Sequence, residues 1–197
     1  MLEIAGTLVG LLYLWLEYKA SIYLWVASIV MPAIYIFVYY DAGLYADFGV
    51  NLYYLLIAVY GWWSWKRGVL SNTSAEANHS QELPITHLPK RRWIPLTMTT
   101  LLIFALIGGI LIYFTDSDVP WLDALTTALS ITGMWLLAQK HIEQWWVWMV
   151  VDLVSVGLYI YKDLQFTAIL YFLYAIIAVL GYRKWKQIMH SSPTSTQ

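Results

Sequence analysis

Residues 57–66 read IAVYGWWSWK and residues 177–186 read IAVLGYRKWK, so this segment returns after an offset of 120 residues. The same offset, without a gap, aligns further identical pairs, among them Thr7 with Thr127, Trp15 with Trp135, Trp25 with Trp145 and Tyr54 with Tyr174. Chance similarity is a poor explanation, because a single offset keeps tryptophan, glycine and lysine in register. An internal repeat in an apolar chain is typical of membrane transporters that hold a substrate between their repeats.

The composition requires lipid as the solvent for most of the chain. Of 197 residues, 60% are hydrophobic, 17% aromatic and only 12% charged, and a soluble domain of this size could not bury so much apolar surface. Twelve Trp and sixteen Tyr can form aromatic belts at both membrane interfaces. The absence of Cys excludes disulfides and thiol nucleophiles, and a net charge of −1 argues against nucleic acid as a partner.

Seven membrane-spanning helices are expected, because a span needs about 20 mainly apolar residues between charged or turn-rich breaks. The expected spans are 3–18, 21–40, 46–66, 93–114, 121–138, 143–161 and 164–183. The sequence therefore predicts an all-α membrane protein. Its expected parts are a first three-helix repeat at 1–66, a cytoplasmic linker at 67–92, a linking transmembrane helix at 93–114, a second three-helix repeat at 121–186 and a disordered cytoplasmic tail at 187–197.

The repeat also predicts how these helices are connected. Three helices place the two ends of a repeat on opposite sides of the membrane, so two repeats of the same orientation need an odd number of crossings between them. Span 93–114 supplies one crossing. We therefore expect a 3+1+3 layout, in which two parallel repeats are joined by one linking helix; no linking span, or two, would have made the repeats inverted.

Basic residues predict the orientation, since cytoplasmic loops are enriched in Lys and Arg. With the C-terminus in the cytoplasm, ten of the eleven basic residues lie on the cytoplasmic side: Lys19, Lys66, Arg67, Lys90, Arg91, Arg92, Lys140, Arg183, Lys184 and Lys186. Only Lys162 falls outside, together with the acidic residues of the outer loops. We expect the N-terminus outside and the C-terminus in the cytoplasm.

With those charges assigned to loops and helix ends, Asp152 is the ionisable residue left in mid-membrane. A charge there costs roughly 2.5–3.5 kcal/mol, so Asp152 is a candidate functional residue. Helical spacing puts it on one stripe with four others: Gln144, Trp148, Ser155 and Tyr159. Such a stripe can stack a flat ring, accept hydrogen bonds and balance a positive charge. The alternative is a protonated Asp152 that only hydrogen-bonds a neighbouring helix.

Repeat-related positions supply the remaining candidates. Pro32 aligns with Asp152 and is a candidate hinge, because proline removes a backbone hydrogen bond; an ordinary membrane-helix proline is the alternative. Two aligned pairs on the third helices are expected to form the opposite wall of the site: Asn51, Tyr54, Tyr171 and Tyr174. The aligned Gly61 and Gly181 predict close helix packing.

Other functional classes fit the sequence less well. A retinal photoreceptor needs a lysine in the middle of its last span, and span 164–183 has none. An enzyme is not expected, because hydrolase, phosphate-loop and dinucleotide motifs are absent, and no metal or cofactor motif is found. A passive channel remains open, since channels and carriers differ in kinetics rather than motifs. Proton coupling through Asp152 is a weaker alternative.

Two motifs resemble those of the Pnu family of bacterial vitamin transporters, which comprises PnuC-type nicotinamide riboside transporters and a thiamine-transporting PnuT branch. Residues 140–148, KHIEQWWVW, followed by Asp152, resemble the family's Lys-x-x-Glu-Asn-Trp-x-x-Trp-x-x-x-Asn stretch. Leu44-Tyr45-Ala46 leading to residues 60–65, YGWWSW, resembles its Leu-Tyr-Ala … Tyr-Gly-Trp-x-x-Trp. The resemblance covers nearly the whole chain, and the family is similar in architecture to the SWEET sugar transporters.

The resemblance implies facilitated diffusion of a vitamin by alternating access in the bacterial inner membrane. It also implies that a separate cytoplasmic kinase traps the substrate, while a homo-oligomer remains open. Asp152 stands where the family's riboside transporters show Asn, and Ala58 where they show Asn before the Tyr-Gly-Trp motif. The gained charge and lost amide favour thiamine as the expected substrate, because its aminopyrimidine offers donors to a carboxylate. Nicotinamide riboside is the alternative.

Overall fold

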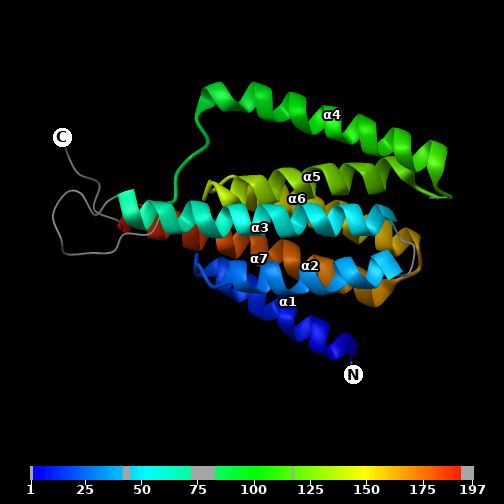
Figure 1. Ribbon diagram of the computed structural model, residues 1–197, viewed down its shortest axis with the longest axis horizontal. Coiled ribbons are helices and arrows are strands. Elements are labelled where there is room, and N and C mark those ends of the chain that lie inside the picture. The colour runs from blue at the N-terminus through cyan, green and yellow to red at the C-terminus, as the bar shows by residue number, and fades with distance from the viewer. Residues whose placement is uncertain (1, 42–44, 72–82, 117, 192–197) are drawn as a thin grey trace. The chain divides into compact units, whose positions relative to one another are not determined.

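The computed structural model describes residues 2–41, 45–71, 83–116 and 118–191. They form seven α-helices in chain order (Figure 1): α1 Leu2–Tyr18, α2 Leu24–Asp41, α3 Tyr45–Ser71, α4 Lys90–Phe114, α5 Pro120–Ala138, α6 Gln144–Tyr161 and α7 Gln165–Ser191. In this part of the chain the β pairing is limited to an isolated parallel bridge between Thr86 and His141. The predicted all-α class is confirmed, and each helix overlaps an expected span.

The ends of three helices correct the predicted boundaries. The expected linker 67–92 is helical at both ends, because α3 continues to Ser71 and α4 begins at Lys90. Residues 187–191 of the expected disordered tail are also helical, since α7 continues to Ser191. The prediction ended each helix where the apolar run ends, but Lys, Arg and Gln are good helix formers and a helix can continue beyond the membrane. Residues 72–82 and 192–197 lie outside the described residues.

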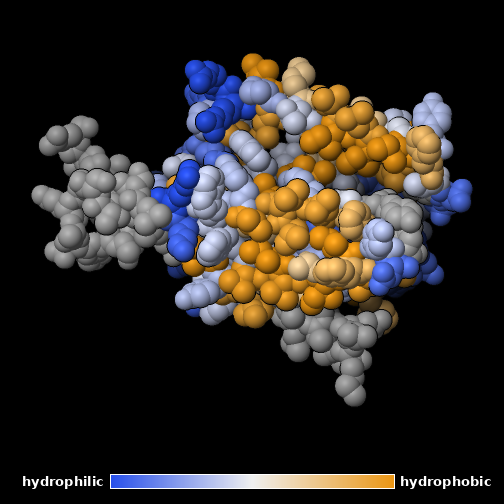
Figure 2. Space-filling model, in the orientation of Figure 1, coloured by the Kyte–Doolittle hydropathy of each residue, from blue (hydrophilic) through white to orange (hydrophobic). Residues whose placement is uncertain are grey.

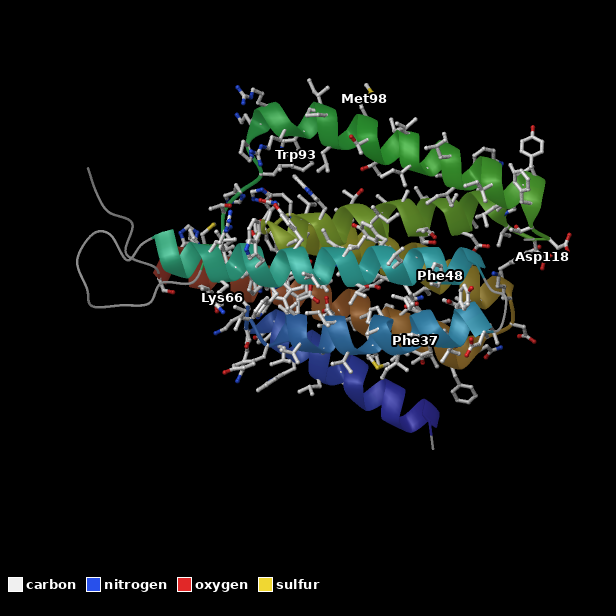
Figure 3. All side chains as sticks on the ribbon, in the orientation of Figure 1. Phe37, Phe48, Lys66, Trp93, Met98 and Asp118 are labelled. Carbon is white, nitrogen blue, oxygen red and sulfur yellow. The ribbon has the colours of Figure 1, made fainter. Side chains whose placement is uncertain are left out.

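Among the described residues, three helices are long and apolar enough to cross a membrane: α4, α5 and α7. A shorter apolar stretch, Leu24–Val38, lies in α2. Large apolar side chains project both from the long apolar helices and from the shorter apolar stretch of α2. Phe37 on α2 is 72% exposed and Met98 on α4 is 63% exposed (Figure 3). Exposure on this scale is expected of a multi-pass membrane protein whose helices face lipid.

Helix α4 illustrates how a lipid-facing helix is built. Gly108 is its one buried residue. Apolar side chains cover the length of α4, whereas hydrophilic ones gather near its two ends (Figure 2). Trp93 lies in its first turns and Asp118 just beyond its end (Figure 3). Aromatic and charged residues at the two ends are typical of the membrane–water interfaces.

Contacts divide the chain into two compact units, which are described separately. Unit 1 comprises Met1–Ile85, Ala138–Lys140 and Gln187–Gln197, and it contains α1, α2 and α3. Unit 2 comprises Thr86–Leu137 and His141–Lys186, and it contains α4, α6 and most of α5 and α7.

Each unit contains a buried tryptophan pair at aligned positions. In unit 1, the rings of Trp25 and Trp65 meet edge to face, with centroids 5.5 Å apart and planes at 90°. In unit 2, Trp145 and Trp185 do the same at 5.7 Å and 88°. All four side chains are almost completely buried. The two units therefore share their internal geometry at this point, as the sequence repeat predicts.

The turns that follow α1 and α5 also match. Ala20 and Lys140, which align, have positive φ angles of 54° and 57°. In each turn the next N–H reaches back into the last turn of the helix, Ser21 to the Leu16 carbonyl and His141 to the Leu136 carbonyl, at 2.9 Å in both. This is the hydrogen bond of a Schellman ending, in which one left-handed residue closes the helix.

Alanine should be poorly tolerated at the aligned glycines Gly61 and Gly181. A Cβ at either position would overlap the indole ring of Trp25 or Trp145, and each of these rings is held by its tryptophan pair. We expect Gly181→Ala to cost about 1–3 kcal/mol, measured as a lower unfolding temperature in detergent. Gly157→Ala is the matched control, because a Cβ there meets nothing within 4 Å. Equal unfolding temperatures for the two variants would contradict the close packing.

Candidate functional site

The stripe predicted from helical spacing forms a largely buried polar face on α6 of unit 2. Gln144, Asp152 and Ser155 are 0%, 6% and 5% exposed, and Trp148 and Tyr159 are half-buried. Polar groups on a membrane helix are expected to face the protein interior or a cavity rather than lipid. The burial of these side chains agrees with that rule, while their part in binding stays a prediction.

Trp148 lies between Gln144 and Asp152 along α6 and packs against α5. Its indole packs on Gly133, where an added Cβ would lie 3.1 Å from Trp148 Cε2. The glycine therefore lets a large flat ring approach the α5 backbone. Trp148 Nε1 is buried without a hydrogen-bond partner, as are both side-chain amide atoms of Gln144. The two residues are one helical turn apart, so unused donors and an unused acceptor lie together on α6.

Tyrosines from α6 and α7 continue the face beyond Asp152. Tyr159 stacks on Tyr171 with ring centroids 5.1 Å apart, and Tyr171 meets Tyr174 edge to face at 5.7 Å. The Asp152 carboxyl acts electrostatically on the hydroxyls of both Tyr171 and Tyr174. The structure thus brings together four of the predicted residues within unit 2, one carboxyl group and three phenol rings.

The remaining candidates lie in unit 1, which is described by itself. Asn51 and Tyr54 are half-buried on α3, and the rings of Tyr53 and Tyr54 are 5.7 Å apart. Pro32 is buried inside α2, and this helix continues past it to Asp41. The proposed roles of Asn51 and Tyr54 as a wall and of Pro32 as a hinge stay predictions.

Sequence reasoning missed a second buried acid. Glu17, in the last turn of α1, is only 2% exposed. Tyr13, one turn earlier, hydrogen-bonds both Glu17 and Ser28 of α2. Glu17 and Asp152 are thus both buried carboxyl groups, whereas the sequence pattern singled out Asp152 in mid-membrane. The signal was present, because Glu17 lies inside the expected span 3–18, but its place near the end of the span suggested a solvated position.

Lys140 is a second charge that the sequence assigned to a cytoplasmic loop and that the structure buries. Its side chain is 3% exposed, and Nζ lies 4.1 Å from the centroid of the Trp65 ring within unit 1. An ammonium over a tryptophan face is a cation–π contact, worth about 0.5–2 kcal/mol. The left-handed backbone at Lys140 directs the chain from α5 into α6, so this residue both ends one helix and contacts an aromatic ring.

Residues 86–88 are held against the α5–α6 turn of unit 2. Ile142 N–H donates to the Thr86 carbonyl at 3.0 Å, and the Thr86 hydroxyl lies 3.0 Å from His141 Nδ1. Glu143 binds the same segment with both oxygens, one 2.8 Å from His87 Nδ1 and one accepting the Leu88 N–H at 2.9 Å. Burial lowers the pKa of His141, so its imidazole is kept neutral beside the threonine.

Loss of the Glu143 carboxylate should release this segment. A hydrogen bond to a charged group contributes about 1.5–3 kcal/mol, so Glu143→Ala is expected to raise hydrogen exchange at the Leu88 amide by roughly tenfold or more. Exchange mass spectrometry of peptides covering residues 83–89 would measure it. His87→Ala is the control, because it leaves the Leu88 bond in place. Equal protection in the wild type and Glu143→Ala would contradict the expectation.

Comparison with known proteins identifies relatives over nearly the whole chain. A family model described as nicotinamide mononucleotide transporter matches residues 1–187. The nicotinamide riboside transporter PnuC of Escherichia coli (strain K12) is 22% identical over 208 residues, covering 93% of this chain and 84% of that protein. The riboflavin/roseoflavin transporter RibM of Streptomyces davaonensis is 26% identical over 183 residues, covering 93% and 83%.

A solved structure has the same fold. The crystal structure of the vitamin B3 transporter PnuC superposes with a TM-score of 0.67 and 21% sequence identity, covering 92% of this chain and 79% of that one. At this identity the likeness shows a shared fold.

Proposed function

The chain belongs to the nicotinamide mononucleotide transporter family, a family of membrane transporters, and on that basis we propose that it carries nicotinamide riboside across the bacterial inner membrane. The observation that carries the proposal is the family match over residues 1–187, which reaches from α1 into the last turns of α7. This match confirms the family resemblance drawn from the two motifs. The relatives named for nicotinamide riboside and for riboflavin support a vitamin with a flat ring as substrate.

Nicotinamide riboside replaces thiamine as the leading candidate. The preference for thiamine rested on Asp152, which stands where the motif has Asn. Both vitamins carry a cationic ring, so a buried carboxylate suits either one. The names of the relatives favour the riboside, and the charge of Asp152 does not oppose it.

The α6 face of unit 2 supplies the chemistry that this substrate needs. The Asp152 carboxylate would balance the pyridinium charge in a medium of low dielectric constant. Trp148 and the tyrosines of α6 and α7 offer faces on which a flat cationic ring stacks, a contact that strengthens when water is excluded. We propose that this face contacts the substrate, and that Asn51 and Tyr54 of unit 1 are further candidate substrate-binding residues.

The proposed architecture is the 3+1+3 layout, with the repeats 1–66 and 121–186 parallel and α4 linking them. The matched tryptophan pairs and the matched turns after α1 and α5 support two units of common ancestry. The distribution of basic residues supports an external N-terminus and a cytoplasmic C-terminus. The proposed transport mechanism is alternating access, in which the substrate site opens to each side of the membrane in turn.

Facilitated diffusion alone only equilibrates a vitamin, so uptake needs a step that removes the free substrate. We propose that a separate cytoplasmic kinase phosphorylates a hydroxyl group of the riboside, since a charged phosphate ester cannot return through the same site. Light scattering of the purified protein would show whether it forms a homo-oligomer. The proposed substrate contacts all come from one chain.

Uptake into proteoliposomes tests the proposed function. We expect saturable entry of labelled nicotinamide riboside, and accelerated entry when unlabelled riboside is loaded inside, because counterflow is a property of carriers and not of channels. An imposed pH gradient should leave the rate unchanged. Saturable entry of thiamine without entry of riboside would overturn the substrate, and linear entry without counterflow would overturn the carrier mechanism.

Riboflavin is the second candidate, because RibM shares 26% identity with this chain over 183 residues. Its flavin ring is flat and uncharged, so it would gain less from the Asp152 carboxylate than a pyridinium does. Competition by riboflavin in the same uptake assay separates the two substrates.

A further inference from the structure

Gln144 is a completely buried polar side chain of unit 2 whose amide makes no hydrogen bond. It is 0% exposed, and both its amide nitrogen and its amide oxygen are buried without a hydrogen-bond partner. Burying a carboxamide in this way loses the hydrogen bonds that water would have made and gains none in return, so it destabilises the protein. A side chain retained at this cost calls for a reason outside packing.

The internal repeat shows what packing alone would place there. The aligned residue in unit 1 is Leu24, which is also 0% exposed. The backbone is the same at both positions: Leu24 N–H donates to the Ser21 carbonyl at 3.1 Å, and Gln144 N–H to the His141 carbonyl at 3.2 Å. Each is followed directly by the tryptophan of its pair. An apolar side chain therefore satisfies this site in one unit, and only the second unit carries an amide.

The surroundings of Gln144 point to a ligand rather than to a structural partner. One turn further along α6, Trp148 presents a flat ring whose Nε1 is also unpartnered, and the next turn brings Asp152. A fully buried amide thus begins the same face that carries the aromatic ring and the carboxylate. At the aligned positions of unit 1 stand Ser28 and Pro32, so unit 1 has neither the indole nor the carboxylate at these positions.

We propose that the Gln144 carboxamide binds the carboxamide group on the transported ring. Its Nε2 donates a hydrogen bond to the carbonyl oxygen of that group, and its Oε1 accepts one from the adjacent N–H. This inference rests on the proposed function and names the chemical group that the site selects. A carboxamide on a ring offers one acceptor and one donor side by side, which matches the two amide atoms of glutamine in a pair of parallel hydrogen bonds. A ring carboxylate offers acceptors alone, and its charge faces Oε1, so it is rejected.

Two ligands that differ only in this group provide the test. Nicotinamide riboside and nicotinic acid riboside share the pyridinium and the ribose, and only the first has a carboxamide. Tryptophan quenching of the purified protein should show tighter binding of the amide. Gln144→Leu should weaken binding of the amide by about tenfold or more and bring the two affinities close together, because two hydrogen bonds are lost. Gln144→Asn, which keeps the amide on a shorter stem, should recover part of the preference.

Stability separates a ligand contact from a structural role. Because Leu24 occupies the aligned position, Gln144→Leu should unfold at the same temperature as the wild type or a higher one. Gln165→Leu is the matched control, since Gln165 is exposed at the start of α7 and should alter neither affinity nor preference. An unchanged amide preference in Gln144→Leu would overturn the inference, and so would a clear loss of stability. A wild type that binds nicotinic acid riboside as tightly as the amide would also overturn it.

The same measurements keep the two proposals apart. If the wild type does not bind nicotinamide riboside, the proposed substrate fails, and riboflavin then serves as the probe because its ring imide also places an acceptor beside an N–H. Loss of riboflavin affinity in Gln144→Leu would support the amide reading. Retained riboflavin affinity, or no binding of either vitamin, would overturn it.

Discussion

Asp152→Leu is expected to lower the uptake of nicotinamide riboside by roughly 30-fold or more while the protein stays folded. Removing one partner of a buried charge pair costs about 2–5 kcal/mol in binding, because the remaining charge is left in an apolar medium. Here the remaining charge would be the pyridinium of the substrate. The loss should appear both as weaker binding by tryptophan quenching and as slower entry into proteoliposomes.

Asp152→Asn separates charge from hydrogen bonding. The amide keeps the shape and one acceptor of the carboxyl group, so we expect binding of the cationic riboside to weaken less than in Asp152→Leu. Neutral riboflavin should be affected less than the riboside by the same change. Asp163→Asn is the matched control, because Asp163 is exposed beyond the end of α6 and has a φ of 57°, a conformation that asparagine tolerates.

The competing account makes Asp152 a structural contact. If a protonated Asp152 only hydrogen-bonds a neighbouring helix, Asp152→Leu should remove that bond. The unfolding temperature should then fall, with little change in riboside affinity. Functional use predicts the opposite pattern, since replacing a buried polar group by a well-packed apolar one is often neutral or stabilising. An unfolding temperature that falls while riboside affinity stays within twofold would settle the question for the structural role.

The sequence predicted the helices well because the membrane imposes a length and a composition on each span. All seven helices overlap the expected spans, and the polar stripe of α6 is buried as the helical spacing indicated. The helix ends were missed because lipid does not decide them. Lys66, Arg67 and the residues after Lys186 continue their helices, since basic side chains favour helix as much as apolar ones do.

Buried charge was harder to predict than buried apolar surface. Glu17 stands near the end of an expected span and Lys140 in the loop between two spans, and linear sequence cannot tell there whether a side chain is solvated or buried. The contact of residues 86–88 with the α5–α6 turn joins segments far apart in sequence and follows no local pattern. The ranking of the substrates was difficult for a related reason, because a single carboxylate recognises charge and not the ring that carries it.

Among the ring contacts of the described residues, the tryptophan pairs should contribute most to stability, because their four side chains are almost completely buried. Their position explains why the repeat is still visible in the sequence. Each pair joins the second helix of a repeat to the third, and the glycine beside it leaves room for the ring of Trp25 or Trp145. Changes at these positions disturb the crossing of two helices.

Trp185→Ala is therefore expected to destabilise the protein by about 3–5 kcal/mol, measured by thermal unfolding in detergent, and Trp65→Ala should lose a similar amount. Combining Trp185→Ala with Trp145→Ala should cost less than the sum, with a coupling of about 0.5–1.5 kcal/mol for the edge-to-face contact. Trp93→Ala is the control, because Trp93 is 47% exposed on α4. If Trp185→Ala and Trp93→Ala unfolded at the same temperature, the pair could not be what holds α6 and α7 together. If only one of Trp185→Ala and Trp65→Ala lowered the unfolding temperature, the two repeats would share the tryptophan pair in sequence but not its contribution to stability.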